Sequence, residues 1–161
     1  MLIVDCDMRN SGVARALGLN NDKGLSTLLA SGGNWHEALQ RYSSEPNLWV
    51  LPSGPIPANP AELLASDAMD LLFEKLASRF KHVILDSPPV LPVTDATILS
   101  RLADGVVLVV ASGDTPRAGL LRTRRILENA GARILGVALN KLDLRHQGYY
   151  GSYQYSYYAR H

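Results

Sequence analysis

Apolar and polar positions along the chain fall into five short apolar runs, separated by stretches in which apolar residues recur at helical spacing. The runs occupy residues 2–4, 48–51, 82–86, 105–111 and 134–139. Short runs of this kind predict buried strands, and the β-branched run at 105–111 is typical of a strand covered on both faces. We therefore expect five strands that alternate with helices.

The clearest helix signal begins at Asn59. Asn59 is a favoured N-cap residue, Pro60 fits the first helical position, and Glu62 completes a capping-box pattern. The apolar residues that follow keep helical spacing, so the sequence predicts one helix over 59–80 with one face packed on a core. These apolar residues are Leu64, Ala68, Leu71, Leu72 and Leu76.

Weaker signals predict shorter helices elsewhere. A helical turn is expected within 10–19, a short helix over 25–29, and another turn or two of helix within 35–42. Further on, Thr94 or Asp95 can begin a short helix to about residue 101. Asp95 is then interpreted as a capping or first-turn residue.

Alternation of strands and helices indicates the fold class. A last helix is expected over 115–131, before the final strand. This order is typical of an α/β protein with a doubly wound, mainly parallel sheet covered on both sides. A chain of 161 residues is long enough for one such domain and too short for two. We place the domain at 1–144 and a separate tail at 145–161.

Composition narrows the classes of function. The chain is 47% hydrophobic and 19% charged, as expected for a soluble globular protein. Its net charge of +1 gives no indication of a nucleic-acid partner. The single cysteine, Cys6, excludes an intramolecular disulfide and is interpreted as structural. We find neither a signal peptide nor an apolar run long enough to span a membrane.

Three carboxylates follow two of the predicted strands. Asp5 and Asp7 stand at the end of the first strand, two positions apart, and Asp86 ends the strand at 82–86. Side chains at i and i+2 of an extended segment point to the same side, and open α/β sheets bind ligands at the carboxyl ends of their strands. Aspartate is also common in turns because it bonds its own backbone. The recurrence at two strands favours a site.

The last residues differ in composition from the domain. Between the tyrosines of this tail lie only Gly, Ser and Gln, so the segment offers little to bury and suits repeated modification. An aromatic strand or an aggregation-prone tract is the alternative interpretation. Six of the seven tyrosines lie here: Tyr149, Tyr150, Tyr153, Tyr155, Tyr157 and Tyr158.

Together, the strand-end carboxylates and the tyrosine tail suggest phosphoryl transfer. That reaction needs phosphates and Mg²⁺ held in place and a residue that orients or deprotonates the nucleophile. Asp5, Asp7 and Asp86 are the candidate metal contacts and base.

With these features, the chain resembles the cytoplasmic domain of the bacterial tyrosine kinases (BY-kinases) that control exopolysaccharide and capsule chain length. Residues 2–9 resemble the Walker A′ motif of that family, an apolar run followed by D-x-D-x-R, and residues 82–89 resemble its Walker B motif. Residues 51–64 and 136–141 are similar to its linking segment and its last strand, and 149–158 to its autophosphorylation tail. The fold implied is that of the MinD/ParA-like class of P-loop NTPases.

By position, the resemblance implies a role for each site residue. Asp5 would be the catalytic base and a Mg²⁺ contact, Asp7 its catalytic companion, and Asp86 the Walker B carboxylate that binds Mg²⁺ directly or through water. Arg9 and Asn140 would contact the nucleotide. ATP and Mg²⁺ are the implied cofactors, and the six tail tyrosines are the implied autophosphorylation sites.

The resemblance also implies partners and a location. A membrane chain-length determinant would act as activator, neighbouring kinase subunits would form a ring-like homo-oligomer, and a tyrosine phosphatase would reverse the reaction. The protein would be cytoplasmic and peripheral to the inner membrane through its partner.

One part of the family pattern is missing from these residues. No G-x-x-x-x-G-K-[ST] motif occurs in residues 1–161. That loop supplies the backbone N–H groups and the lysine that hold the phosphates. In the family the loop, its strand and its helix precede Walker A′, and the strand lies centrally in the sheet. We therefore expect a doubly wound sheet that lacks the P-loop strand and helix, with an exposed apolar edge.

Three functions remain open at this stage. In the first, the chain is the C-terminal part of an ATP-dependent protein-tyrosine kinase that autophosphorylates its tail and regulates exopolysaccharide chain length or export, and it is inactive without Walker A. In the second, it is a non-catalytic partner whose tail is phosphorylated by a complete kinase. In the third, it is a MinD/ParA-like ATPase, in which the tyrosine tail has no role.

Overall fold

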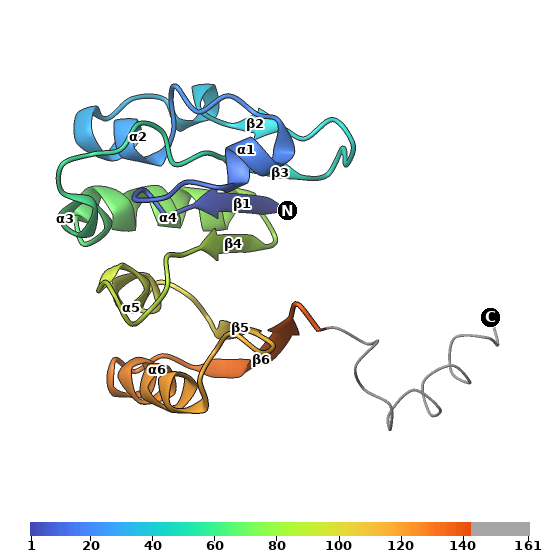
Figure 1. Cartoon of the computed structure of the whole chain (residues 1–161). Coiled ribbons are helices and arrows are strands. Elements are labelled where there is room, and N and C mark those ends of the chain that lie inside the picture. Colours follow the sequence, from blue (N-terminus) through green and yellow to red (C-terminus); the bar gives the residue numbers. More distant parts are fainter. Residues whose placement is uncertain (143–161) are drawn as a thin grey trace.

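Strand β1 (Leu2–Asp5) lies inside a four-stranded sheet (Figure 1) in the computed structural model, which describes residues 1–142. It pairs in parallel with β3 (Trp49–Leu51) on one side and with β4 (Val83–Asp86) on the other. The two-residue strand β2 (Gln40–Arg41) adds to β3 in antiparallel fashion, so the order is β2-β3-β1-β4.

The remaining two strands form a sheet of their own. Strands β5 (Val106–Ala111) and β6 (Ile134–Asn140) pair in parallel, with a register irregularity between Val106 and Val107. The α/β class and the parallel pairing are confirmed. The sheet is not continuous, however, because in residues 1–142 no ladder joins β4 to β5. Within these residues β4 therefore pairs with β1 alone, and β5 pairs with β6 alone.

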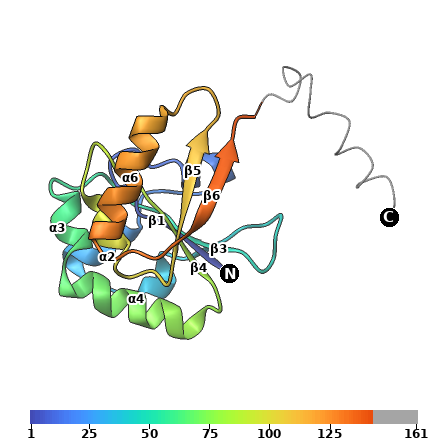
Figure 2. The same ribbon diagram turned by 90° about the horizontal axis from the view of Figure 1, so that it is seen from below.

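Helices connect the strands and cover them. Figure 2 shows the last helix lying along one side of β5 and β6. None of the helices described is both long and apolar enough to cross a membrane. The helices are α1 (Val13–Leu17), α2 (Leu25–Ser31), the 3₁₀ turn η1 (Trp35–Glu37), α3 (Pro60–Leu64), α4 (Asp67–Arg79), α5 (Asp95–Leu99) and α6 (Arg117–Asn129).

The single helix expected over 59–80 is wrong, because the segment forms two helices. The side chain of Ser66 ends α3 by donating to the Leu63 carbonyl (2.7 Å) and caps α4 by accepting from the Met69 amide (3.4 Å). The break resets the helical phase, so Met69 is buried while Leu71 is exposed. At the N-terminus of α3, the Asn59 side chain donates to the Glu62 side chain and does not bond a backbone amide.

The helical turns expected within 35–42 are half right. One 3₁₀ turn forms at η1, and its N-cap Asn34 accepts from the His36 amide at 3.1 Å. The chain then extends into β2, which pairs with β3. Two paired residues carry too weak an alternating pattern to distinguish a strand from a loop in the sequence.

A core lies under the four-stranded sheet. It combines β1 and β3 with apolar side chains of α2, α3 and α4. The fully buried apolar side chains at its centre are Leu2, Val4, Leu25, Leu51, Leu64, Met69 and Leu76.

The second sheet is covered far less. Leu108 of β5 is buried and faces Leu120 and Leu121 of α6 across a hollow of about 390 Å³. The adjacent side chains Val107 and Val109, which point to the opposite face, are 55% and 70% exposed. The expectation of a strand buried on both faces is therefore wrong, because nothing in residues 1–142 packs on that face.

Candidate functional site

Two predicted carboxylates meet at the carboxyl edge of the four-stranded sheet. Asp5 ends β1 and Asp86 ends β4, and the two residues are direct partners in the parallel register. The backbone continues this alignment by one residue, because the Cys6 amide donates to the Asp86 carbonyl at 2.8 Å. The sequence prediction that these strand ends lie together thus agrees with the geometry.

Asp5 is held rigidly at this edge. Its side chain is fully buried. Oδ1 accepts from the Asp7 amide (3.2 Å), and Oδ2 accepts from the Ser11 hydroxyl (2.9 Å) and the Val13 amide (3.2 Å). A buried carboxylate needs such donors, and three of them also fix its orientation.

Asp7 organises the loop that follows β1. Its Oδ1 accepts from the backbone amides of Arg9 (3.2 Å) and Asn10 (2.9 Å). This is the local turn chemistry that was the alternative interpretation of the aspartates. The turn role and the site role are therefore compatible at Asp7, because the bonds use Oδ1 and the turn holds the residue beside Asp5.

Asp86 has the opposite surroundings. Among residues 1–142 no hydrogen bond to its carboxylate is found, and the side chain lies at the exposed end of β4. Partial burial, and then the charges on Asp5 and Asp7, raise the pKa of Asp86. A carboxylate that is crowded by like charges and has no donor is suited to a cation.

Mg²⁺ suits this edge only in part. Residues 1–142 hold no group of three or more His, Cys, Asp or Glu side chains placed to bind a metal. Mg²⁺ is commonly bound by one or two carboxylates together with waters and substrate phosphates. Asp86, with Asp5 behind it, fits that pattern, and the ion would supply charge neutralisation for the phosphates.

Cys6 lies between the carboxylates and is buried. Burial first, and then the charges on Asp5 and Asp86, raise the pKa of the thiol well above its usual value. Its thiolate is therefore disfavoured, in keeping with the structural role expected from the sequence.

Arg9 is committed to a partner that the sequence did not suggest. Its guanidinium donates to both carboxylate oxygens of Asp95, from Nε to Oδ2 at 2.8 Å and from Nη2 to Oδ1 at 3.1 Å. Asp95 is a first-turn residue of α5 as expected, but it is no cap, since its carboxylate is used by Arg9. A nucleotide contact by Arg9 stays a prediction.

Asn140 lies in the other sheet. It ends β6, and its side-chain oxygen accepts from the Lys141 amide at 2.8 Å. No hydrogen bond or ion pair within residues 1–142 joins it to the carboxylates of the first sheet. A nucleotide contact by Asn140 stays a prediction. The six tail tyrosines lie outside the residues described.

A polar chain behind Asp5 was missed by the sequence reasoning. Asn21 reaches the hydroxyls of Ser11 and Ser53 (both 3.5 Å) and brackets the backbone of Gly54, accepting from its amide at 2.9 Å and donating to its carbonyl at 3.2 Å. Ser11 in turn donates to Asp5. The partner of Asn21 lies 33 positions away, so nothing in the local sequence indicates the contact.

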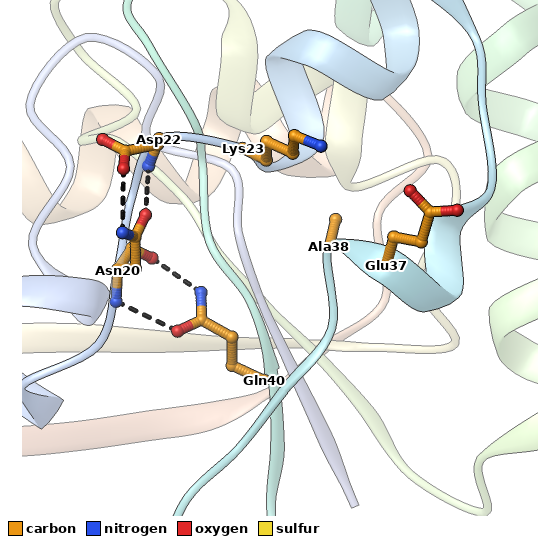
Figure 3. A pocket seen from close by; sticks show the side chains of 6 residues that line it. All are labelled: Asn20, Asp22, Lys23, Glu37, Ala38 and Gln40. Atoms are coloured by element: carbon orange, nitrogen blue, oxygen red, sulfur yellow. Dashed lines mark hydrogen bonds between the residues drawn. The ribbon is translucent and has the colours of Figure 1, made fainter.

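A surface hollow of about 290 Å³ lies beside this network (Figure 3). Asn20 and Gln40 exchange two hydrogen bonds across it, of 3.0 and 2.6 Å, and Asn20 also bonds Asp22. These bonds tie the loop after α1 to the start of β2. The lining contains none of the predicted site residues: Asn20, Asp22, Lys23, Glu37, Ala38 and Gln40.

Known proteins resemble the chain in sequence. The tyrosine-protein kinase YwqD of Bacillus subtilis is 39% identical over 153 residues, which are 95% of this chain and 64% of that protein. The tyrosine-protein kinase CpsD of Streptococcus agalactiae is 33% identical over 94% of this chain and 67% of its own length. The chain thus spans about two thirds of these relatives. No family model matches it.

Solved structures agree in fold. The kinase domain of the Escherichia coli tyrosine kinase ETK superposes with a TM-score of 0.85 at 31% identity, over 89% of this chain and 56% of that one. MinD from Pyrococcus horikoshii, solved with Mg-ADP, shares the fold at a TM-score of 0.68 and 20% identity, over 86% of this chain and 56% of its own. By its kinase relatives and its P-loop NTPase fold, the chain belongs to the family of bacterial tyrosine-protein kinases.

Proposed function

We propose that the chain is the C-terminal part of an ATP-dependent protein-tyrosine kinase that phosphorylates its own tyrosine tail. The alignment of Asp5 with Asp86 at the sheet edge is the observation that carries the proposal. It places a rigid carboxylate beside one that is free to bind a cation. Through the phosphorylated tail, the complete protein regulates the chain length or export of an exopolysaccharide.

The two carboxylates divide the work of phosphoryl transfer. A tyrosine hydroxyl oxygen of a neighbouring subunit attacks the γ-phosphorus of ATP, ADP leaves, and the phenolic proton passes to Asp5. Asp86 binds Mg²⁺, and Asp7 keeps the loop in place beside both. The different surroundings support the metal role of Asp86, because its carboxylate is left without a donor in residues 1–142, whereas Asp5 accepts three hydrogen bonds that fix its orientation.

By itself the chain is expected to be inactive. Residues 1–161 lack the loop that holds the phosphates, and losing even one donor set of that kind commonly costs several kcal/mol of transition-state stabilisation. The separation of β4 from β5 and the exposed side chains on β5 support the same conclusion. A further strand and helix would fill that space in the complete protein.

A phosphotyrosine blot after incubation with ATP and Mg²⁺ tests this directly. The chain alone is expected to give no signal. A strong signal that disappears in Asp5→Asn would overturn the claim that the missing loop is essential. Added to a complete kinase of the family, the chain should become phosphorylated. Tyr42→Phe should keep that signal, and replacement of the six tail tyrosines by Phe should remove it.

A non-catalytic partner phosphorylated by a complete kinase is the second candidate, and the absent P-loop motif favours it equally. The coding DNA upstream of Met1 distinguishes the two. An in-frame P-loop supports the kinase, and a stop codon just upstream supports the partner. For the third candidate, a MinD/ParA-like ATPase, the likeness at 20% identity supports the fold alone.

The partners proposed for the complete protein follow from the family. They are a membrane chain-length determinant that activates the kinase, neighbouring subunits in a ring-like oligomer, and a tyrosine phosphatase. Co-purification of the complete protein with membranes that contain the activator, and its loss from membranes that lack it, tests the peripheral location.

A further inference from the structure

The ion pair between Arg9 and Asp95 joins two segments that lie 86 positions apart. The Asp95 side chain is fully buried, whereas that of Arg9 is 41% exposed. Two parallel hydrogen bonds from a guanidinium to a carboxylate fix direction as well as distance. Within residues 1–142, Arg9 is the side chain that neutralises this buried charge.

The backbone of Arg9 belongs to the loop that carries the site. Its amide donates to Asp7, and the Asp7 amide donates to Asp5. The loop is thus anchored at one end by β1 and Asp5. At the other end it is anchored by the Arg9 side chain on Asp95. Between these anchors Met8 is fully buried in the core, so the Arg9 side chain acts mainly on the part of the loop beyond Met8.

The position of Asp95 in the fold shows which segments its ion pair with Arg9 connects. Asp95 is the first residue of α5, the helix that follows β4 and Asp86 in the chain. The pair therefore bridges the segment after one carboxylate strand to the segment after the other.

We propose that Asp95 is a positioning residue, which acts through Arg9 to hold the Asp7 loop in register with Asp5 and Asp86. No hydrogen bond within residues 1–142 joins the Asp95 side chain to Asp5, Asp7 or Asp86. The role of Arg9 is then to orient the loop. The proposal concerns the geometry of the chain itself, and only its metal readout rests on the proposed function.

Amide hydrogen exchange on the chain provides the first test. Asp95→Asn removes the charge but keeps the shape, and the amides of Arg9 and Asn10 should exchange roughly tenfold faster or more. The amides of Leu2 and Cys6, which bond across to the β4 segment, should keep their rates. Equal acceleration at all four amides, or none at any, would overturn the proposal.

Two further variants guard this result. Arg9→Lys keeps the charge that Asp95 requires but loses the paired bonds, so amide exchange in the Asp7 loop should be faster. This variant provides the test if Asp95→Asn fails to fold. Glu128→Gln removes an exposed carboxylate that pairs with Arg124 on α6, where Nε lies 2.7 Å from Oε1, and should leave the loop unchanged. Loop acceleration in Glu128→Gln would contradict the proposal.

Titration with Mg²⁺, followed by the amide signals of Cys6 and Asp7, provides the second readout. Asp95→Asn should weaken Mg²⁺ binding about tenfold, as outer residues that orient ligands commonly do, and Glu128→Gln should not. Unchanged affinity in Asp95→Asn would count against the positioning role. If the unaltered chain shows no Mg²⁺ response, the proposed metal role of Asp86 fails, and hydrogen exchange alone decides the role of Asp95.

Discussion

The two sheets of the chain share parallel pairing and similar apolar sequences, yet they differ in how fully their side chains are covered. In the four-stranded sheet, Leu2, Val4, Val50 and Leu51 are all fully buried. In the two-stranded sheet, Val109 is 70% exposed. The comparison shows that an apolar strand sequence predicts burial only where another segment is present to cover the strand.

The largest effect should come from truncating the covered sheet. Leu51→Ala leaves a cavity in a packed core and should lower the free energy of unfolding by about 2–5 kcal/mol. The matched change Leu135→Ala, on the exposed β6, should alter it by no more than about 0.5 kcal/mol. Urea denaturation measures both. Equal losses would show that the second sheet is covered in solution.

A glycine beside the site should be nearly as sensitive. A Cβ at Gly24 would fall on the Pro52 carbonyl and the Gly54 amide, which are backbone atoms that cannot rotate away. Gly24→Ala should therefore cost about 1–3 kcal/mol in urea denaturation. Gly12→Ala is the control, because nothing lies within 4 Å of its Cβ. An unchanged free energy of unfolding in Gly24→Ala would mean that the start of α2 packs less closely on the backbone of Pro52 and Gly54 than the structure shows.

Removing the crowded charge at the sheet edge should stabilise the chain. A carboxyl whose pKa is raised on folding favours the folded state when protonated and loses that contribution as pH rises through its folded pKa. Asp86→Asn should therefore raise the melting temperature at pH 7, by roughly 2–4 °C for each kcal/mol of repulsion removed.

The pH profile supplies the check on this prediction. Near pH 3, below the ordinary pKa of aspartate of about 3.9, Asp86→Asn and the unaltered chain should melt together. Asp104→Asn, an exposed carboxylate outside the site, should show no such gain at pH 7. Mg²⁺ should narrow the difference by stabilising the unaltered chain. A loss of stability in Asp86→Asn would contradict the electrostatic argument.

The smallest effect on stability is expected on the uncovered face. Val109→Lys should leave the free energy of unfolding within about 0.5 kcal/mol while reducing self-association, which sedimentation at several concentrations would measure. Leu108→Lys, one position away but buried under α6, should unfold the second sheet. Unchanged association in Val109→Lys would show that this face is not adhesive.

The sequence predicted the elements with their own local signals and missed those that depend on distant partners. The strands ending in Asp5 and Asp86 follow from continuous apolar runs, and their meeting follows from parallel topology. The break at Ser66 could not be foreseen, because the apolar spacing across it mimics one helix. The exposure of Val109 was missed because composition cannot show which covering segments are present.

The site divides in the same way. The roles of Asp5 and Asp7 in the loop could be anticipated from strand-end and turn chemistry. The bond from Arg9 to Asp95 could not, since neither spacing nor residue type distinguishes a buried first-turn aspartate from an ordinary one. Such pairing depends on how α5 returns to the sheet, which is a tertiary property.

The parallel pairing of β1 has a consequence for the newly made chain. Leu2 pairs with Trp49 on one side and with Val83 on the other, so both neighbours are synthesised well after β1. At roughly 5–20 residues per second, the ribosome needs about 4–16 s to reach Val83. For somewhat more than the first half of that interval β1 has neither partner, and for the rest it lacks β4. A chaperone that shields residues 2–5 during translation should therefore raise the yield of folded protein more than one added after release.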